Sequence, residues 1–324
     1  MEWDKNGKGN GKEFGTSNTV SDDVTAISFE GLDITGATII PNNNPNTIYY
    51  FDADATIPAS MNGKNVVKGY KAVGDFNLQD GYNFYVPKMF TVDGIANYTR
   101  TTTIAGTEQE GWRTIVLPFT VSQVKNATDN QEIQWRHCSD NEKKDFWVKE
   151  FNQVDDNQVS FEYVDTWMPN EPYIISVPNE LTGKKMVFSA TETKVYPTAT
   201  CAKVTNDYSF IGTPYDQTLS DIYVMNEAGT AFEPSQEATV EAGSAYFTVS
   251  KKVSPQPTSI PIFNILLGDA NGDGVVNVSD AVLVVNYILG GDCPEIVFEN
   301  ADVNGDKTLN VSDAVGIVSI ILGQ

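Results

Sequence analysis

The stretch from Asp269 to Asp280 reads DANGDGVVNVSD, and the stretch from Asp302 to Asp313 reads DVNGDKTLNVSD. Both place an oxygen-bearing side chain at loop positions 1, 3, 5, 9 and 12, and both run into an apolar segment. Extended to Gly290 and Gly323, the two copies are identical at 14 of 22 positions, so they form a tandem repeat. Calcium binds about six to eight oxygen ligands from carboxylates, amides, backbone carbonyls and water. The repeat therefore predicts two calcium sites rather than two ordinary turns.

Each site is expected to use the side chains at positions 1, 3, 5 and 12, the position-7 carbonyl, and the position-9 amide through a water molecule. The first set of predicted ligands is Asp269, Asn271, Asp273, Val275, Asn277 and Asp280. The second set is Asp302, Asn304, Asp306, Thr308, Asn310 and Asp313. Lys307 stands where the first loop has a glycine, which costs about 1 kcal/mol if the backbone is left-handed there.

A helix is expected after each loop. The Ser-Asp pairs at 279–280 and 312–313 can start a helix, and Gly290 and Gly323 can end it in the left-handed conformation. The segments between are apolar almost all round, so one face can pack on the other repeat and the rest must meet a partner or the preceding domain. Because Ser254–Pro261 is rich in proline, no helix is expected just before the first loop. Each unit is therefore a loop with an exiting helix, and not a complete EF-hand.

This arrangement resembles a type I dockerin in its D-x-N-x-D-G-x-x-N-x-x-D loop, its apolar helix and its duplication, over about the last 58 residues. The resemblance implies that the tail docks onto a cohesin domain or another protein partner. It also implies that the contacts lie along the two helices, at Val278, Ser279, Val282, Val285, Leu289, Val311, Ser312, Val315, Val318 and Leu322. The Val-Ser pairs occupy positions that are often Ser-Thr in clostridial dockerins, which leaves the partner open.

Composition narrows the classes of partner and the location. The chain has 324 residues, with 43 acidic against 21 basic side chains and a formal charge of −22. This balance excludes nucleic acid, whose phosphates require Lys and Arg, and anionic membrane surfaces. No apolar run reaches the length of a transmembrane helix. Weak oxygen-rich calcium loops suit the millimolar calcium outside cells, so we expect a secreted protein or one on a bacterial cell surface.

The region from about Val24 to Lys252 shows a β pattern. Short runs rich in Tyr, Phe, Val, Ile and Thr alternate with polar residues and are separated by Gly, Asn, Asp and Pro. The predicted strands are Thr25–Phe29, Thr47–Phe51, Tyr82–Val86, Tyr98–Ile104, Arg113–Val121, Phe146–Phe151, Val159–Val164, Tyr173–Val177, Met186–Ala190, Tyr208–Ile211 and Ala245–Val249. The only competing helical signal is a possible turn near Val121–Asn126.

The predicted fold class is mainly β, with β-sandwich-like modules followed by a small all-α dockerin-like domain. The expected organisation is a polar linker over 1–23, a small β module over 24–96, a β-sandwich-like module over 97–252, a Pro-rich linker over 253–266 and the dockerin-like domain over 267–324. The first residues have no apolar core like that of a signal peptide, and we expect them to be the cut end of a larger or processed protein.

A second resemblance concerns the β region. Segments such as Asp80–Lys88, Trp112–Phe119 and Gly243–Phe247 are similar to β modules of secreted or surface proteins of gut Bacteroidetes, which often precede a dockerin-like tail. These segments are short, and the function of that family is poorly defined. The resemblance implies a location and an order of modules, but no chemistry.

No catalytic residue is predicted. His137 is the only histidine and Gly-x-Ser-x-Gly is absent, so nothing indicates a Ser-His-Asp triad. Paired carboxylates for glycoside hydrolysis remain open, because their pairing is spatial. Trp112, Trp135, Trp147 and Trp167 are expected in a core more often than on a sugar-binding surface. Of the three cysteines, Cys293 lies in the tail, and whether Cys138 and Cys201 form a disulfide is left open.

Three functions follow from these features. We favour a non-catalytic protein whose β modules display or bind a ligand and whose calcium-loaded tail docks onto a partner protein. The first alternative is a carbohydrate-active module, glycan-binding or hydrolytic, delivered by the tail. The second is a structural tail that packs in cis on its own β region. A Pro-rich linker favours docking in trans, because it acts as a semi-rigid spacer.

Overall fold

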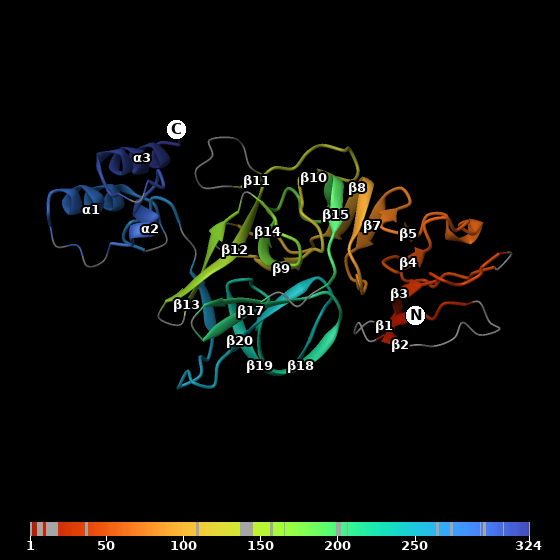
Figure 1. Ribbon diagram of the computed structural model, residues 1–324. Helices are drawn as coiled ribbons and strands as arrows, with labels where there is room; N and C mark the ends of the chain where they lie inside the picture. Colours follow the sequence, from red (N-terminus) through yellow and green to blue (C-terminus); the bar gives the residue numbers. More distant parts are fainter. Residues whose placement is uncertain are drawn as a thin grey trace. The chain divides into compact units, whose positions relative to one another are not determined.

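The computed structural model in Figure 1 describes residues 2–4, 9–10, 19–35, 38–107, 110–136, 145–155, 158–164, 166–198, 202–205, 207–263, 266–272, 275–291, 293, 296–306 and 308–323. The chain divides into two compact units. The β unit comprises residues 1–135 and 144–262, and the C-terminal unit comprises residues 136–143 and 263–324. Each unit has its own hydrophobic core.

The fold class predicted from the sequence is confirmed. The described part of the β unit consists of strands and loops, with one short 3-10 turn, η1 (Ala59–Met61). Three helices lie among the described residues of the C-terminal unit: α1 (Val278–Ile288), α2 (Phe298–Ala301) and α3 (Val311–Ile321). The chain is therefore mainly β with a small helical C-terminal unit. No helix among the described residues is long and apolar enough to cross a membrane.

Ten of the described strands form one sheet, in the order β10-β15-β8-β6-β5-β4-β3-β1-β2, with β7 paired to β8. Their bounds are β1 Glu2–Asp4, β2 Gly9–Asn10, β3 Val24–Ser28, β4 Ile48–Phe51, β5 Asn65–Lys68, β6 Lys71–Ala72, β7 Phe76–Gln79, β8 Phe90–Thr101, β10 Gln123–Asn126 and β15 Lys185–Val195. Strands β3, β4 and β5 run parallel, whereas β8 and β15 form a long antiparallel pair.

Eleven further described strands form the second sheet, in the order β16-β17-β20-β18-β19-β21-β13-β12-β14-β9, with β11 paired to β12. Their bounds are β9 Arg113–Val116, β11 Trp135–Arg136, β12 Phe146–Asp155, β13 Gln158–Tyr163, β14 Pro172–Ser176, β16 Ala202–Thr205, β17 Tyr208–Thr213, β18 Gln217–Met225, β19 Ala231–Val240, β20 Ser244–Val249 and β21 Ile260–Phe263. The sheet curls back on itself, because β9 at its end meets β20: the Val116 amide donates to the Gly243 carbonyl at 2.8 Å, and the Ala245 amide to Thr114 Oγ1 at 2.9 Å.

Strands that lie between two cores are apolar on both faces. All five residues of β14 are buried, with Tyr173 and Ile175 in the core between the two sheets and Ile174 in the core inside the curled sheet. Side chains alternate across a strand, so a continuous apolar run is what such a position requires. The core inside the curled sheet is rich in phenylalanine, and Phe247 lies 4.7 Å from both the Phe210 and Phe232 ring centroids.

Three sequence predictions about the β unit differ from the structure. The predicted strand Tyr82–Val86 forms no strand, because its backbone pairs with loops: the Phe84 amide donates to the Pro214 carbonyl and the Val86 amide to Thr198 Oγ1. The possible helical turn near Val121–Asn126 is instead β10, which pairs with β15. The expected module boundary near residue 97 falls inside β8, whose whole length from Phe90 to Thr101 pairs with β15.

Buried asparagines satisfy backbone groups where the parallel strands β4 and β5 begin. The Asn46 side chain accepts from the Gln79 amide at 2.7 Å and donates to the carbonyls of Gln79 and Tyr82. Asn65 in β5 likewise accepts from the Asn77 amide at 2.8 Å. Such amides replace the hydrogen bonds that a neighbouring strand would otherwise supply.

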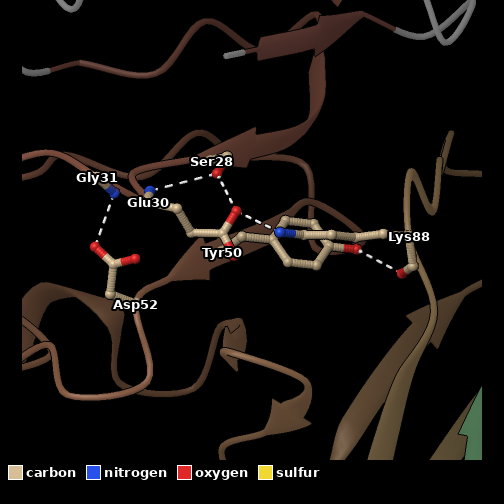
Figure 2. Close-up of polar contacts among 6 residues, drawn as sticks. All are labelled: Ser28, Glu30, Gly31, Tyr50, Asp52 and Lys88. Carbon is tan, nitrogen blue, oxygen red and sulfur yellow. Dashed lines mark hydrogen bonds and ion pairs between the residues drawn. The ribbon is translucent and has the colours of Figure 1, made fainter.

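Figure 2 shows how the turn after β3 is held. Ser28 Oγ donates to the Glu30 carboxylate at 2.7 Å, and the Lys88 ammonium donates to the same carboxylate oxygen. The ammonium also lies 4.9 Å from the centroid of the Tyr50 ring in β4. Burial, followed by the charge of Glu30, raises the pKa of the Tyr50 phenol. Tyr50 therefore stays neutral beneath the Lys88–Glu30 ion pair, and the cluster has a structural role.

Candidate metal centre and docking face

The first acidic loop closes around the carboxylate of Asp280, which is completely buried. One oxygen of Asp280 accepts from the Asn271 amide at 3.1 Å, and the other accepts from the Asn277 amide at 2.8 Å. Asn277 in turn accepts from the Ser279 amide at 2.8 Å and is the N-cap of α1. The two side chains form a capping box, so the loop and the helix are one cooperative unit.

The second loop repeats this geometry. Asp313, also completely buried, accepts from the Asn304 amide at 3.4 Å and from the Asn310 amide at 2.9 Å. Asn310 caps α3 by accepting from the Ser312 amide at 2.8 Å. The φ angles of the two N-cap residues, −147° and −148°, are almost equal. The tandem repeat in sequence is therefore a tandem repeat in structure.

The helix boundaries refine the sequence expectation. Both helices begin one residue before the predicted Ser-Asp pair, at Val278 and Val311, because the position-9 asparagines act as caps. The predicted ends are confirmed, since Gly290 and Gly323 have φ of +82° and +69°. The short helix α2 before the second loop was not predicted. Its four residues lie between segments that carry no clear helical period.

The predicted metal ligands are distributed unevenly over the described residues. Asp269 and Asp302, at position 1 of each loop, are buried like the position-12 aspartates, whereas Val275, Asn304, Asp306 and Thr308 are exposed. Asp273, Gly274 and Lys307 lie outside the described residues. Within the described ranges, no three Asp, Glu, His or Cys side chains gather closely enough to form a metal site by themselves.

The donors nonetheless fit a hard cation such as calcium. Each loop buries two carboxylates within twelve residues, and its described residues include no basic side chain. Buried like charges are costly unless a cation compensates them. A carboxylate oxygen that accepts one N–H keeps a further lone pair, so the capping contacts of Asp280 and Asp313 leave room for a metal bond.

The two long helices pack together through small residues. Ala281 and Val284 of α1 and Ala314 and Ile317 of α3 are buried in the core of the C-terminal unit. Gly316 of α3 permits the close approach of Val303, which follows α2, because an added Cβ would clash with the Val303 side chain. Beside this contact, valine side chains of both helices remain exposed.

The exposed valines lie along a groove of about 480 Å³, lined only by valine and alanine. Each helix contributes four equivalent positions, and the lining residues are Val278, Ala281, Val282, Val285, Val311, Ala314, Val315 and Val318. The six valines are between 44% and 65% exposed. We call these eight residues the docking groove.

The other predicted partner-binding residues lie outside this groove. Ser279 and Leu289 line an adjoining hollow along α1, and Ser312 and Leu322 are exposed at α3. Sequence reasoning missed Ala281 and Ala314, since small residues in an apolar run carry no distinctive signal.

The four tryptophans singled out in the β unit lie in or against its cores. Trp112, Trp147 and Trp167 are buried, and Trp135 packs against the central core. Lys203 in β16 forms ion pairs with Glu150 and, at 3.3 Å, with Glu171. Burial alone would lower the pKa of Lys203, but the hydrogen bond and charge of Glu150, with those of Glu171, outweigh it and raise the pKa. Both carboxylates are therefore engaged in ion pairs with Lys203.

The remaining sequence candidates cannot be placed. His137, Cys138 and Cys201 lie outside the described residues. Cys293 is a free, buried thiol in the C-terminal unit.

Comparison with known proteins identifies one segment. Residues 267–321 match the dockerin type I domain family. No curated protein and no solved structure matches the chain. Type I dockerins bind calcium and imply a cohesin-type protein partner. The paired loops, the capped helices and this match lead to one conclusion: the chain carries a dockerin type I domain at residues 267–321, after a β-rich region.

Proposed function

We propose that this protein is a non-catalytic secreted or cell-surface protein, whose dockerin domain attaches the β unit to a cohesin-type partner through the docking groove. The β unit is then the attached component, which displays or binds a ligand. The resemblance of the β region to modules of secreted or surface proteins of gut Bacteroidetes supports an extracellular location. The observation that carries the proposal is the docking groove.

The groove has the properties of a protein contact. Its lining contains no polar side chain, and its six valines are exposed. Contiguous apolar patches of several hundred Å² are uncommon on monomers and usually mark an interaction site. Full burial of one valine side chain contributes about 1.5–3 kcal/mol, so six partly exposed valines represent a substantial contribution to binding.

The two acidic loops lead directly into the helices whose side chains line the groove. Each loop is proposed to bind one calcium ion through its aspartates and asparagines at positions 1, 3, 5 and 12, with the position-7 carbonyl and with position 9 acting through water. When bound, the ion neutralises the buried carboxylates. The carboxylates of Asp280 and Asp313 accept hydrogen bonds from backbone amides of the loops. Asn277 and Asn310 cap the helices that carry the valines.

Calcium is expected to stabilise the C-terminal unit and leave the β unit unchanged. At calcium a hundredfold above its dissociation constant, each site should add about 2.7 kcal/mol to the free energy of unfolding. Titration calorimetry should give two ions per chain, and hydrogen exchange in α1 and α3 should slow on moving from EDTA to calcium. A variant combining Asp269→Ala with Asp302→Ala should lose both effects. Uptake that this variant retains would contradict the assignment of the sites.

The docking groove can be tested by placing charge in it. Val282→Asp combined with Val315→Asp should weaken binding to a cohesin domain by about a hundredfold, because a carboxylate would be buried against an apolar partner. Binding of the full chain to a panel of purified cohesin domains, with calcium present, measures this. Tyr287→Asp is the matched control, since Tyr287 lies on α1 but does not line the groove.

The outcomes separate docking from packing within the chain. Binding that survives the double substitution, or no binding by any cohesin domain in the panel, would contradict the proposal. A fall in the melting temperature of the β unit in the double variant, with Tyr287→Asp unchanged, would instead support a tail that packs in cis.

A further inference from the structure

The β unit contains a pocket that neither the calcium loops nor the docking groove uses. It has a volume of about 490 Å³ and lies on β18 and β19, next to the end of β20. Its lining residues are Asp221, Ile222, Tyr223, Pro234, Ser235, Gln236, Val249, Lys251 and Gln256. Pockets that bind small ligands have volumes of about 300–1,000 Å³ and combine an apolar lining with a few polar groups.

An unusual backbone conformation lies at this pocket. Asp221 has a φ of +55°, in the left-handed region, although it lies inside β18. The pairing of β18 with β19 keeps its register on both sides of it, from Ser220 with Glu237 to Ile222 with Ser235. Asp221 therefore stands opposite Gln236 without adding a residue to the strand. A left-handed residue other than glycine costs roughly 1–2 kcal/mol, and such residues concentrate at binding sites. Glycine would avoid this cost, but it would remove the carboxylate from the pocket.

Hydrogen bonds within the protein hold two of the lining residues, Tyr223 and Gln256, in place. Tyr223 is buried, and its hydroxyl donates to the Pro257 carbonyl at 3.0 Å. The Gln256 amide nitrogen donates to the carbonyls of Ser250 at 2.9 Å and Val253 at 2.7 Å. These bonds hold the loop after β20 against β18, so a ligand would meet a wall that is already formed. Preorganisation of this kind reduces the entropy lost on binding.

Three polar side chains of the lining are available to a ligand. Among the described residues, the side chains of Asp221, Gln236 and Lys251 have no hydrogen-bond or ion-pair partner, and all three are exposed. Asp221 accepts hydrogen bonds, Lys251 donates them, and Gln236 does both. One negative and one positive group leave the pocket without a net charge, so net charge favours neither an anion nor a cation. Beside them, Pro234 and Val249 supply apolar surface.

We propose that this pocket binds a neutral saccharide of one or two sugar rings. A sugar ring presents hydroxyl groups that both donate and accept, together with apolar C–H faces, and this combination matches the three polar side chains and the Pro234–Val249 surface. The pocket volume is appropriate for a ligand of that size. The assignment concerns the β unit alone, and it stands independently of the docking proposal.

The test uses the full chain with calcium present. A glycan microarray containing neutral and acidic oligosaccharides identifies ligands, and NMR titration of the best neutral ligand measures its affinity. Asp221→Asn retains a residue that tolerates the left-handed backbone but removes the charge, and Gln236→Ala removes the opposite amide. Each should weaken binding by at least about tenfold, as expected for a lost hydrogen bond to a charged or polar group. Glu237→Gln, the neighbouring exposed residue on β19, is the control and should bind like the wild type.

The binding measurements distinguish a saccharide site in this pocket from binding elsewhere. Unchanged melting temperatures show that the variants are folded, so loss of binding reports on the pocket. Binding of a neutral saccharide that Asp221→Asn and Gln236→Ala do not weaken would overturn the proposal. The same holds if only charged glycans bind, or if no neutral saccharide binds at about 10 mM, where even a millimolar dissociation constant gives near-saturation.

Discussion

Replacing Asp280 with alanine is expected to unfold α1 and, with it, most of the C-terminal unit. The carboxylate accepts two backbone N–H groups, from Asn271 and Asn277, and it is completely buried. Hydrogen bonds to a charged group contribute about 1.5–3 kcal/mol each, so the expected loss is about 3 kcal/mol or more. A unit of about 70 residues has a small core, so such a loss is a large part of its stability. Hydrogen exchange should show α1 unprotected while the β unit remains protected.

The control for this prediction is the neighbouring Ser279→Ala. Ser279 is exposed, and its side chain donates no hydrogen bond to the described residues, so α1 should remain folded. Asp280→Asn should give an intermediate loss, because it keeps one acceptor oxygen but removes the charge that strengthens the bonds. Protection of α1 that survives Asp280→Ala would show that the capping box does not organise this helix.

Gly229→Ala is expected to destabilise the β unit severely. Gly229 lies in the turn between β18 and β19, has a φ of +67°, and receives a hydrogen bond from the Trp112 amide at 3.2 Å. An added Cβ would lie 2.6 Å from both the Gly111 carbonyl carbon and the Trp112 carbonyl oxygen, and would clash with the Trp112 amide nitrogen. These are backbone atoms beside a fully buried tryptophan, so they cannot move aside cheaply. We expect a loss of about 3 kcal/mol or more, visible as a lower melting temperature of the β unit.

Gly183→Ala separates the clash from the backbone effect. Gly183 has a φ of +78°, but no heavy atom lies within 4 Å of an added Cβ. Its substitution should therefore cost only the left-handed backbone term, about 1–2 kcal/mol. Equal destabilisation by the two substitutions would show that the contact with Gly111 and Trp112 is unimportant.

Local patterns predicted the C-terminal unit well because its structure is determined by short-range interactions. The spacing of Asp, Asn and Gly indicates the loops, and Gly290 and Gly323 end the helices as expected. The capping role of Asn277 was not predicted, because its position in the loop also matches a calcium ligand and the Ser-Asp pair after it is an alternative helix start. The docking groove requires knowledge of how α1 packs on α3, which the sequence of each helix alone does not contain.

The β unit shows the limits of local patterns. Strands such as β3, β4 and β14 were found because they are rich in aromatic and β-branched residues. The predicted boundary near residue 97 placed a division inside β8, because nothing near that residue indicates that its partner is the distant β15. The pocket at Asp221 could not be predicted either, since its walls come from three strands and a loop.

The pairing of β8 with β15 also has a consequence for synthesis. Phe90 pairs with Val195, and Thr101 pairs with Lys185. Roughly a hundred further residues must therefore be synthesised before β15 can pair with β8. At about 5–20 residues per second, the ribosome would leave this edge of β8 open for several seconds or more. The dockerin segment at residues 267–321, in contrast, is continuous in sequence and can form as soon as it emerges. The β unit is therefore the slow and aggregation-sensitive part of the chain, and its helical tail is the fast-folding part.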